Sequence, residues 1–242
     1  MKQQTVQKIL FQTTATYNNI VEDFNKTRSY LWPGLRQLGG YVKPGDKVLD
    51  LGCGNGKLRL LFKDVKVEYT GVDNSIELLK LAESRKDFEI PNQKFIKADA
   101  FALPFADNTF DSVFFIAVFH HLPGKELRRQ ALAEIRRVLK PGGYLLMTNW
   151  NRYQKENVRY VIKYTWLKII GQTDLDFKDI YLPWMGGKAE RYYHAFTLSE
   201  LRRLIAGSGL KIQQNYLAKF DGTRVNRVNY FTAANLVTIA KK

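Results

Sequence analysis

The chain has 242 residues, of which 45% are hydrophobic and 25% are charged, and it carries a formal net charge of +15. These values are typical of one soluble globular domain and exclude a disordered chain. No apolar run approaches the roughly 18 residues that span a bilayer, and the N-terminus leads into no signal-like segment. We therefore expect a cytoplasmic protein without a transmembrane segment. Cys53 is the only cysteine, which excludes an internal disulfide and a cysteine-based zinc site, and we predict no metal site.

The positive charge is unevenly distributed along the chain. Residues 44–150 carry 16 lysines and arginines against 14 acidic residues, so +13 of the net charge of +15 lies in residues 1–43 and 151–242. A polyanion, either a nucleic acid or an acidic membrane face, is the natural partner of such flanks. The alternative is that the excess charge serves solubility alone.

Residues 1–43 are predicted to form a helical extension. Apolar residues recur at helical spacing over residues 5–24, and Trp32-Pro33 and Gly39-Gly40 then end the pattern.

Residues 44–150 alternate between short apolar strands and helices. The strand at 111–117 is apolar on both faces, which is typical of a central parallel strand. The repeated β-α-β order predicts an α/β domain with a mostly parallel sheet and right-handed crossovers. The other predicted strands are 48–51, 67–73, 94–97 and 144–150, and the predicted helices are 57–63, the segment after Asn74 or Ser75, and 125–139.

Residues 151–196 break this alternation and are predicted to be an insertion after the fifth strand. A helix over 198–206 and strands over 212–217 and 230–240 then complete the domain in residues 197–242. The whole chain is thus predicted to be one domain built around the core at 44–150.

A glycine-rich turn, Gly52-Cys53-Gly54-Asn55-Gly56, joins the first strand to the first helix. Glycines here allow the backbone to turn tightly and to approach a ligand closely. Asp73 ends the second strand, where a carboxylate can accept the hydroxyl groups of a ribose. The turn follows Asp50, which suits an ammonium group better than a pyrophosphate. Asp99, at the end of the third strand, is placed to bind an adenine amine.

Residues 46–150 resemble class I S-adenosylmethionine-dependent methyltransferases of the methyltransferase-11 type. The resemblance rests on 48–56, Gly71-Val72-Asp73, Ala98-Asp99-Ala100, Leu103-Pro104-Phe105, Phe110-Asp111, His120-His121-Leu122 and 139–143. It implies a Rossmann-like fold with a mostly parallel seven-stranded sheet, an N-terminal helical extension and an insertion after strand five. It also implies S-adenosylmethionine as the cofactor, bound by Asp50, Gly52, Gly54, Gly56, Asp73, Asn74, Asp99, Ala100 and Ile116.

The two flanks resemble a narrower family, the tRNA methyltransferases that esterify carboxymethyl groups on the wobble uridine. The matching stretches are Tyr17 to Pro33 before the first strand, Trp150, and 191–196 after the fifth strand. The resemblance implies the anticodon loop of a tRNA as substrate and leaves open whether a small activating subunit is needed. The substrate-binding residues that it implies are Tyr17, Trp32, His120, Trp150, Tyr192, Tyr193 and His194.

The catalytic candidates are Arg28, Arg191 and His121. A carboxylate acceptor is already ionised at neutral pH and needs no general base, but it needs a cation to orient it. A guanidinium can hold a carboxylate in a fixed plane. His120 and His121 either line the acceptor pocket or pack as turn residues. Tyr192 and Tyr193 either stack on a nucleobase or belong to the core of the insertion.

A basic amphipathic helix is predicted at the start of the insertion. It would bind phosphates, lie on a membrane, or present a solvated face. A second possible function is therefore a small-molecule or quinone-type methyltransferase at a membrane surface. A third is a regulatory protein that only binds the cofactor, which the intact cofactor motif argues against. The basic face would hold Arg152, Lys155, Arg159 and Lys163, and the apolar face Val158, Ile162, Trp166 and Ile169.

Overall fold

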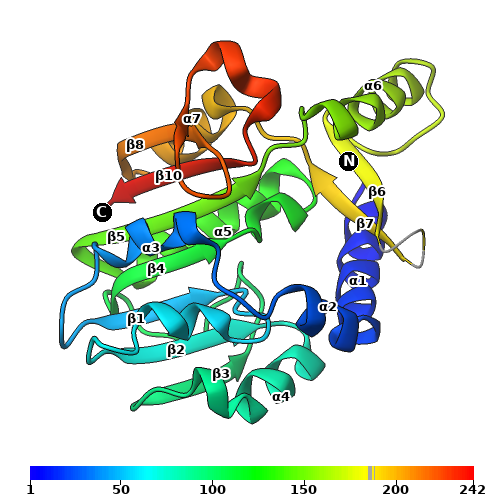
Figure 1. Ribbon diagram of the computed structural model, residues 1–242. Coiled ribbons are helices and arrows are strands. Elements are labelled where there is room, and N and C mark those ends of the chain that lie inside the picture. The colour runs from blue at the N-terminus through cyan, green and yellow to red at the C-terminus, as the bar shows by residue number, and fades with distance from the viewer. Residues whose placement is uncertain (185–186, 188) are drawn as a thin grey trace.

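The computed structural model describes residues 1–184, 187 and 189–242 and forms an α/β domain around one large sheet. The strands of the sheet follow the order β3-β2-β1-β4-β5-β10-β8-β9, and Figure 1 shows them one above another, from β3 at the bottom to β10 and β8 near the top. The strands are β1 (Lys47–Leu51), β2 (Glu68–Asp73), β3 (Gln93–Lys97), β4 (Phe110–Ile116), β5 (Leu139–Trp150), β8 (Lys211–Ala218), β9 (Arg224–Val225) and β10 (Asn235–Lys241).

The sheet is mostly parallel, as the sequence predicts. Strands β1 to β5 pair in parallel, whereas β10 pairs antiparallel with both β5 and β8. The sheet contains the seven expected strands and one more, the two-residue β9 at its edge. The last predicted strand is shorter than expected, because residues 227–232 form a 3-10 helix and β10 begins only at Asn235.

Helices pack on both faces of the sheet. Alternate residues of the central strands enter two separate cores, so Phe115 packs with one face and Phe114 with the other. The helices and short 3-10 turns that surround the sheet are α3 (Arg36–Gly39), α4 (Ile76–Ser84), α5 (Lys125–Val138), α7 (Leu198–Gly207), η1 (Pro33–Leu35), η2 (Lys57–Leu61), η3 (Lys86–Phe88) and η4 (Phe119–His121).

Two predicted helices differ from the structure. The single helix expected over 5–24 is divided at Ile20 into α1 (Gln3–Asn19) and α2 (Val21–Thr27). The helix expected over 57–63 is only the 3-10 turn η2. Its buried Arg59 donates to the carbonyl oxygens of Gly56 and Ala82, which holds the chain in a tight turn.

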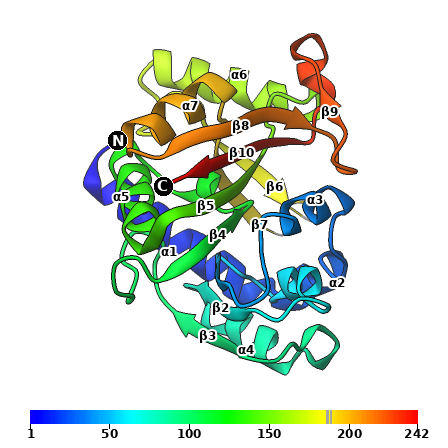
Figure 2. The same cartoon turned by 90° about the vertical axis from the view of Figure 1, so that its left-hand side faces the viewer.

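The insertion forms one helix, α6 (Lys155–Ile169), and an antiparallel hairpin of β6 (Asp179–Trp184) and β7 (Ala189–His194). Figure 1 shows this hairpin beside α1, which β7 contacts, and Figure 2 shows it behind the strands of the main sheet.

The predicted apolar face of α6 is largely exposed to solvent. Ile162, Trp166 and Ile169 are more than 60% exposed, and the helix packs instead through the buried Val161. No described helix is long and apolar enough to cross a membrane.

Candidate active site

The glycine turn lies at the carboxyl end of β1, between β2 and β4. Gly52 and Gly54 both have a positive φ, at 75° and 55°. A Cβ atom on Gly52 would lie 2.3 Å from Val118, and one on Gly54 would lie 3.2 Å from the ring of Phe24. The turn is therefore closely packed, and glycine is required for both its backbone conformation and its fit. This is the position in the sheet where open α/β folds bind ligands.

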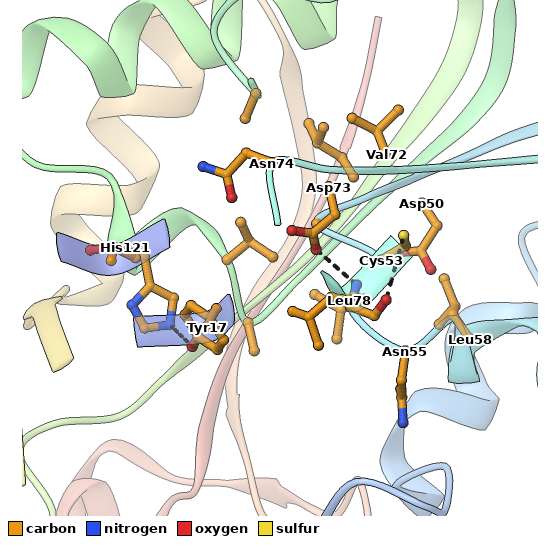
Figure 3. Close-up of a pocket in the computed structure, with 18 of the residues that line it drawn as sticks. Tyr17, Asp50, Cys53, Asn55, Leu58, Val72, Asp73, Asn74, Leu78 and His121 are labelled. Atoms are coloured by element: carbon orange, nitrogen blue, oxygen red, sulfur yellow. Dashed lines mark hydrogen bonds between the residues drawn. The ribbon is translucent and has the colours of Figure 1, made fainter. Parts of the chain in front are cut away.

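A cavity opens above this turn. All the predicted cofactor residues except Gly56 line it: Asp50, Gly52, Gly54, Asp73, Asn74, Asp99, Ala100 and Ile116. Figure 3 shows Asp73 pointing toward the turn, where its carboxylate accepts the backbone N–H of Gly54 at 2.9 Å. Its other oxygen accepts the N–H of Ser75 at 2.9 Å, which fixes the carboxylate at the edge of the cavity.

Helix α1 closes one side of the cavity. Asn74 donates to the hydroxyl of Thr14 at 3.0 Å, and Ser75 donates to the side-chain oxygen of Asn18 at 2.6 Å. The end of α2 is held by Asn55, which donates to the carbonyl oxygen of Arg28 at 3.2 Å. The N-terminal extension is therefore part of the site.

Two ionisable groups beneath the turn have pKa values near neutrality. Burial raises the pKa of Asp50 to about 7, although a 2.6 Å hydrogen bond from Tyr69 opposes the shift. Burial also lowers the pKa of Lys57 to about 7, and the nearby Arg28 lowers it further. Lys57 lines the same cavity and was not singled out in the sequence.

The far end of the cavity is lined by the predicted acceptor residues Tyr17, Trp32, His121 and Trp150. The Tyr17 hydroxyl and His121 Nε2 lie 2.9 Å apart, and this pair lies across the cavity from Asp50 in Figure 3. His121 Nδ1 lies 2.9 Å from the carbonyl oxygen of Tyr192, which can only accept. The ring hydrogen is therefore on Nδ1, and Nε2 accepts from Tyr17. Burial and the charge of Arg191 lower the pKa of His121 to about 3, so this imidazole is neutral.

Three guanidinium groups surround the indole of Trp150. The guanidinium carbons of Arg28, Arg152 and Arg191 lie 5.4, 4.5 and 5.6 Å from its ring centre. Arg152 and Arg191 are only 7% and 8% exposed. Among the described residues, no carboxylate lies within 4.0 Å of any of the three groups. Burial lowers the pKa of both Arg28 and Arg152, that of Arg152 to about 10, and repulsion by Arg191 adds to both shifts.

Several predicted site residues do not line the cavity, and these assignments need correction. Gly56 instead leaves room for Arg59, because a Cβ atom at this position would lie 2.8 Å from the Arg59 guanidinium. His120 is fully buried and packs against Trp150 and Tyr193.

The predicted nucleobase platform of Tyr192 and Tyr193 is also wrong, because both side chains are buried. Tyr192 packs with Ile9 and Leu175, and Tyr193 packs within the insertion and against Trp150. They are core residues of the insertion.

His194 has a structural environment away from the cavity. Its two ring nitrogens lie 2.6 Å from Asp179 and 2.8 Å from Glu200, and this cluster ties the hairpin to α7.

Arg152 was assigned to the wrong environment. It precedes α6 rather than lying on its basic face, and its guanidinium is buried against Trp150 and Tyr193. The signal that could have found it is its position two residues after Trp150, just beyond the carboxyl end of a central strand.

The comparisons with known proteins agree with this geometry. The profile of the methyltransferase domain family matches residues 49–147. A protein of Encephalitozoon cuniculi, named as a methyltransferase without a substrate, is 32% identical over 81% of this chain and 85% of its own length. The chain belongs to the S-adenosylmethionine-dependent methyltransferases.

Two further relatives of this methyltransferase carry a substrate in their names. A tRNA (carboxymethyluridine(34)-5-O)-methyltransferase of Arabidopsis thaliana is 34% identical over 58% of this chain, which spans 33% of that protein. One of the same name from Schizosaccharomyces pombe is 28% identical over 82% of this chain and 88% of its own length. The chain thus spans about a third of the plant relative and most of the yeast one.

Solved structures share the fold of this methyltransferase. A methyltransferase of Methanosarcina mazei superposes with a TM-score of 0.69 at 24% identity, over 88% of this chain and 98% of that one. A chain from the complex between the Haloferax volcanii Trm112 methyltransferase activator and a methyltransferase gives a TM-score of 0.66 at 20% identity, over 95% and 96%. At these identities the likeness concerns the fold.

Proposed function

We propose that this methyltransferase esterifies the carboxylate of a carboxymethyl-type modified uridine at the wobble position of a tRNA. The observation that carries the proposal is the group of three arginines around Trp150 at the acceptor end, of which Arg152 and Arg191 are buried. Charges buried without partners are costly, so such a set favours an anionic ligand. Arg28 and Arg191 both line the cavity that contains the cofactor residues.

The cofactor end suits S-adenosylmethionine. When bound, this cofactor supplies an electrophilic methyl group on a sulfonium. In the proposal, Asp50 and the glycine turn hold its methionine part, Asp73 its ribose and Asp99 its adenine. The charge of Asp73 adds to the rise in the pKa of Asp50, and a cationic ligand would relieve this repulsion.

At the acceptor end, Arg28 and Arg191 would hold the carboxylate, and Tyr17 would orient it. Burial raises the pKa of Tyr17 to about 12, so its hydroxyl stays protonated. Because the neutral His121 accepts from Tyr17, we assign His121 a positioning role rather than proton transfer. The acceptor carboxylate is ionised at neutral pH and needs no base. Alignment and exclusion of water are then the main contributions of the chain.

The names of the Arabidopsis and yeast relatives support the tRNA substrate. The basic flanks of the chain also suit a polyanion. The proposal includes an activating subunit, because a structurally similar methyltransferase was solved in complex with an activator. It also includes a cytoplasmic location.

A second candidate is a small-molecule methyltransferase at a membrane surface. The observation that favours it is the exposed apolar face of α6, which carries Ile162, Trp166 and Ile169 beside basic residues.

The test uses purified protein, S-adenosylmethionine with a labelled methyl group, and tRNA that carries 5-carboxymethyluridine. We expect label in the RNA that mild alkali removes, as an ester requires, and none in tRNA that lacks the carboxymethyl group. Alkali-stable label, or label found only in added lipid, would reject the carboxylate acceptor. A parallel assay with an added Trm112-type activator measures whether turnover depends on a subunit.

A further inference from the structure

A second cavity adjoins the acceptor end of the first. It is lined by Thr27, Arg28, Tyr30, Trp32, Trp150, Arg152, Gln154, Phe220 and Ala234. Arg28, Trp32 and Trp150 line both cavities, whereas Arg191 lines only the inner one and Arg152 only the outer one. The arginines are thus distributed over two adjoining spaces, with Arg28 between them.

Arg152 has unused hydrogen-bond donors beside the outer cavity. It is more than nine-tenths buried, and its Nε and Nη2 atoms are buried without a hydrogen-bond partner. The turn that carries it is held rigidly, because Asn151 donates to the carbonyl oxygens of Tyr230 and Ala233 at 2.7 and 3.0 Å. A fixed guanidinium with unused donors is suited to a tetrahedral or planar oxyanion.

One carboxylate does not balance three neighbouring cations, of which Arg152 and Arg191 are buried. Each guanidinium carbon lies within 5.6 Å of the same indole centre, so a second anion would lie close to the first. Two anions this close are most simply supplied by one molecule. In a modified nucleotide, the carboxylate on the base and the backbone phosphate are such a pair.

The rim of the outer cavity is aromatic. Tyr30 is 61% exposed and Phe220 is 55% exposed, and Phe220 is held edge-on against Trp32 at 5.5 Å. Exposed aromatic rings beside a cationic groove are the usual surface on which unpaired bases stack. This rim favours a nucleic-acid strand over a free inorganic anion.

We propose that the outer cavity binds a phosphodiester of the RNA backbone next to the modified uridine, with Arg152 as its anchor and Tyr30 and Phe220 in contact with an adjoining base. This inference rests on the proposed function and deepens it. It makes Arg152 a specificity residue that distinguishes a nucleotide in a strand from a free nucleoside, while Arg191 serves the carboxylate.

The test compares kcat/KM for two acceptors, the nucleoside 5-carboxymethyluridine and a trinucleotide with that nucleoside in the middle. We expect the wild-type protein to prefer the trinucleotide by about tenfold or more, as one charge-assisted contact implies. In Arg152→Met this ratio should fall toward one, and Arg152→Lys should recover part of it because the ammonium keeps the charge. Arg202→Met is the matched control, because it removes the same charge from an exposed site on α7 that lines neither cavity.

A substrate-side experiment needs no variant. A trinucleotide with uncharged methylphosphonate linkages keeps its bases but loses the backbone charge, and the wild-type protein should treat it like the nucleoside. Single replacements on the 5′ or 3′ side would then identify which phosphate is bound.

The outcomes separate the two proposals. If both acceptors are esterified but neither Arg152→Met nor the methylphosphonates change the ratio, the outer cavity is not a phosphate site and the proposed function stands. If neither acceptor is esterified, the proposed function fails and this inference fails with it. A calorimetric titration with S-adenosylhomocysteine checks that the Arg152 variants are folded.

Discussion

The two ends of the main cavity are opposite in charge and in origin. The cofactor end is acidic, with Asp50, Asp73 and Asp99, and comes from the ends of three neighbouring strands. The acceptor end is cationic and aromatic, and comes from the N-terminal extension, β5 and the inserted hairpin. The difference suits the proposed pairing of a cationic cofactor with an anionic acceptor, in which the fold supplies the first site and the additions to the fold supply the second.

The largest effect should come from removing the central acid of the cofactor end. We expect Asp73→Ala to weaken cofactor binding by about 100-fold or more, because the variant loses a carboxylate that also fixes the backbone of Gly54. Calorimetric titration with S-adenosylmethionine measures this. Asp107→Ala, an exposed acid outside the cavity, is the control. Unchanged affinity in Asp73→Ala would show that the cofactor lies elsewhere.

Removing an acceptor cation should leave the cofactor end intact. For Arg191→Met we expect kcat/KM for the carboxymethyl acceptor to fall by about 100-fold, since a charge-assisted contact to the carboxylate is lost. The cofactor dissociation constant should change by no more than about threefold. Arg28→Ala should behave in the same way. If either variant loses cofactor affinity as severely as Asp73→Ala, the division into two ends is wrong.

A smaller effect is expected for the orienting hydroxyl. Tyr17→Phe removes the hydrogen bond to His121 and keeps the ring. Turnover should fall by about tenfold, as the loss of one neutral hydrogen bond implies. The pH profile of kcat should keep its shape, because neither residue transfers a proton in the proposed mechanism. An acidic limb that disappears in Tyr17→Phe would instead assign His121 a role in proton transfer.

The smallest effect is the pH dependence of the cofactor end. Asp50 and Lys57 both have a pKa of about 7, so both take up a proton as the pH falls from 7.5 to 5.5. Each protonation makes the cavity more positive, so the affinity for the cationic cofactor should fall several-fold over this range.

The variant Asp50→Asn tests the direction of this pH dependence of cofactor affinity. The variant should bind the cofactor more weakly at pH 7.5 and show a flatter dependence on pH. Wild-type affinity that rises as the pH falls would contradict the assignment of Asp50 to the methionine end.

The cofactor end could be predicted from the sequence because its signals are local. The glycine turn and Asp73 follow successive strands, and parallel strands bring their carboxyl ends to one edge of the sheet. Periodicity likewise predicted the strands of the core and their mostly parallel sheet. It failed at β9 and at the short turn η2, where single contacts such as those of Arg59 decide the backbone.

The acceptor end could be predicted only in part. Its residues lie on segments far apart in the chain, and no spacing relates Arg28 to Arg191. Tyr192 and Tyr193 were misassigned because the sequence does not show that the hairpin packs against α1 and η4 on its two faces. Arg152 was misassigned because helical periodicity was extended three residues before the helix begins.

The hydrogen bonds from α1 to Asn74 and Ser75 have a kinetic consequence. Spent cofactor cannot leave past this side of the cavity while Thr14 and Asn18 are engaged. Helix α1 buries only one of its own residues, Ile9, and is also held by the hydrogen bond between Tyr17 and His121 and by that between Met1 and Asp176. We therefore expect product exchange along this side of the cavity to require displacement of the N-terminal helix.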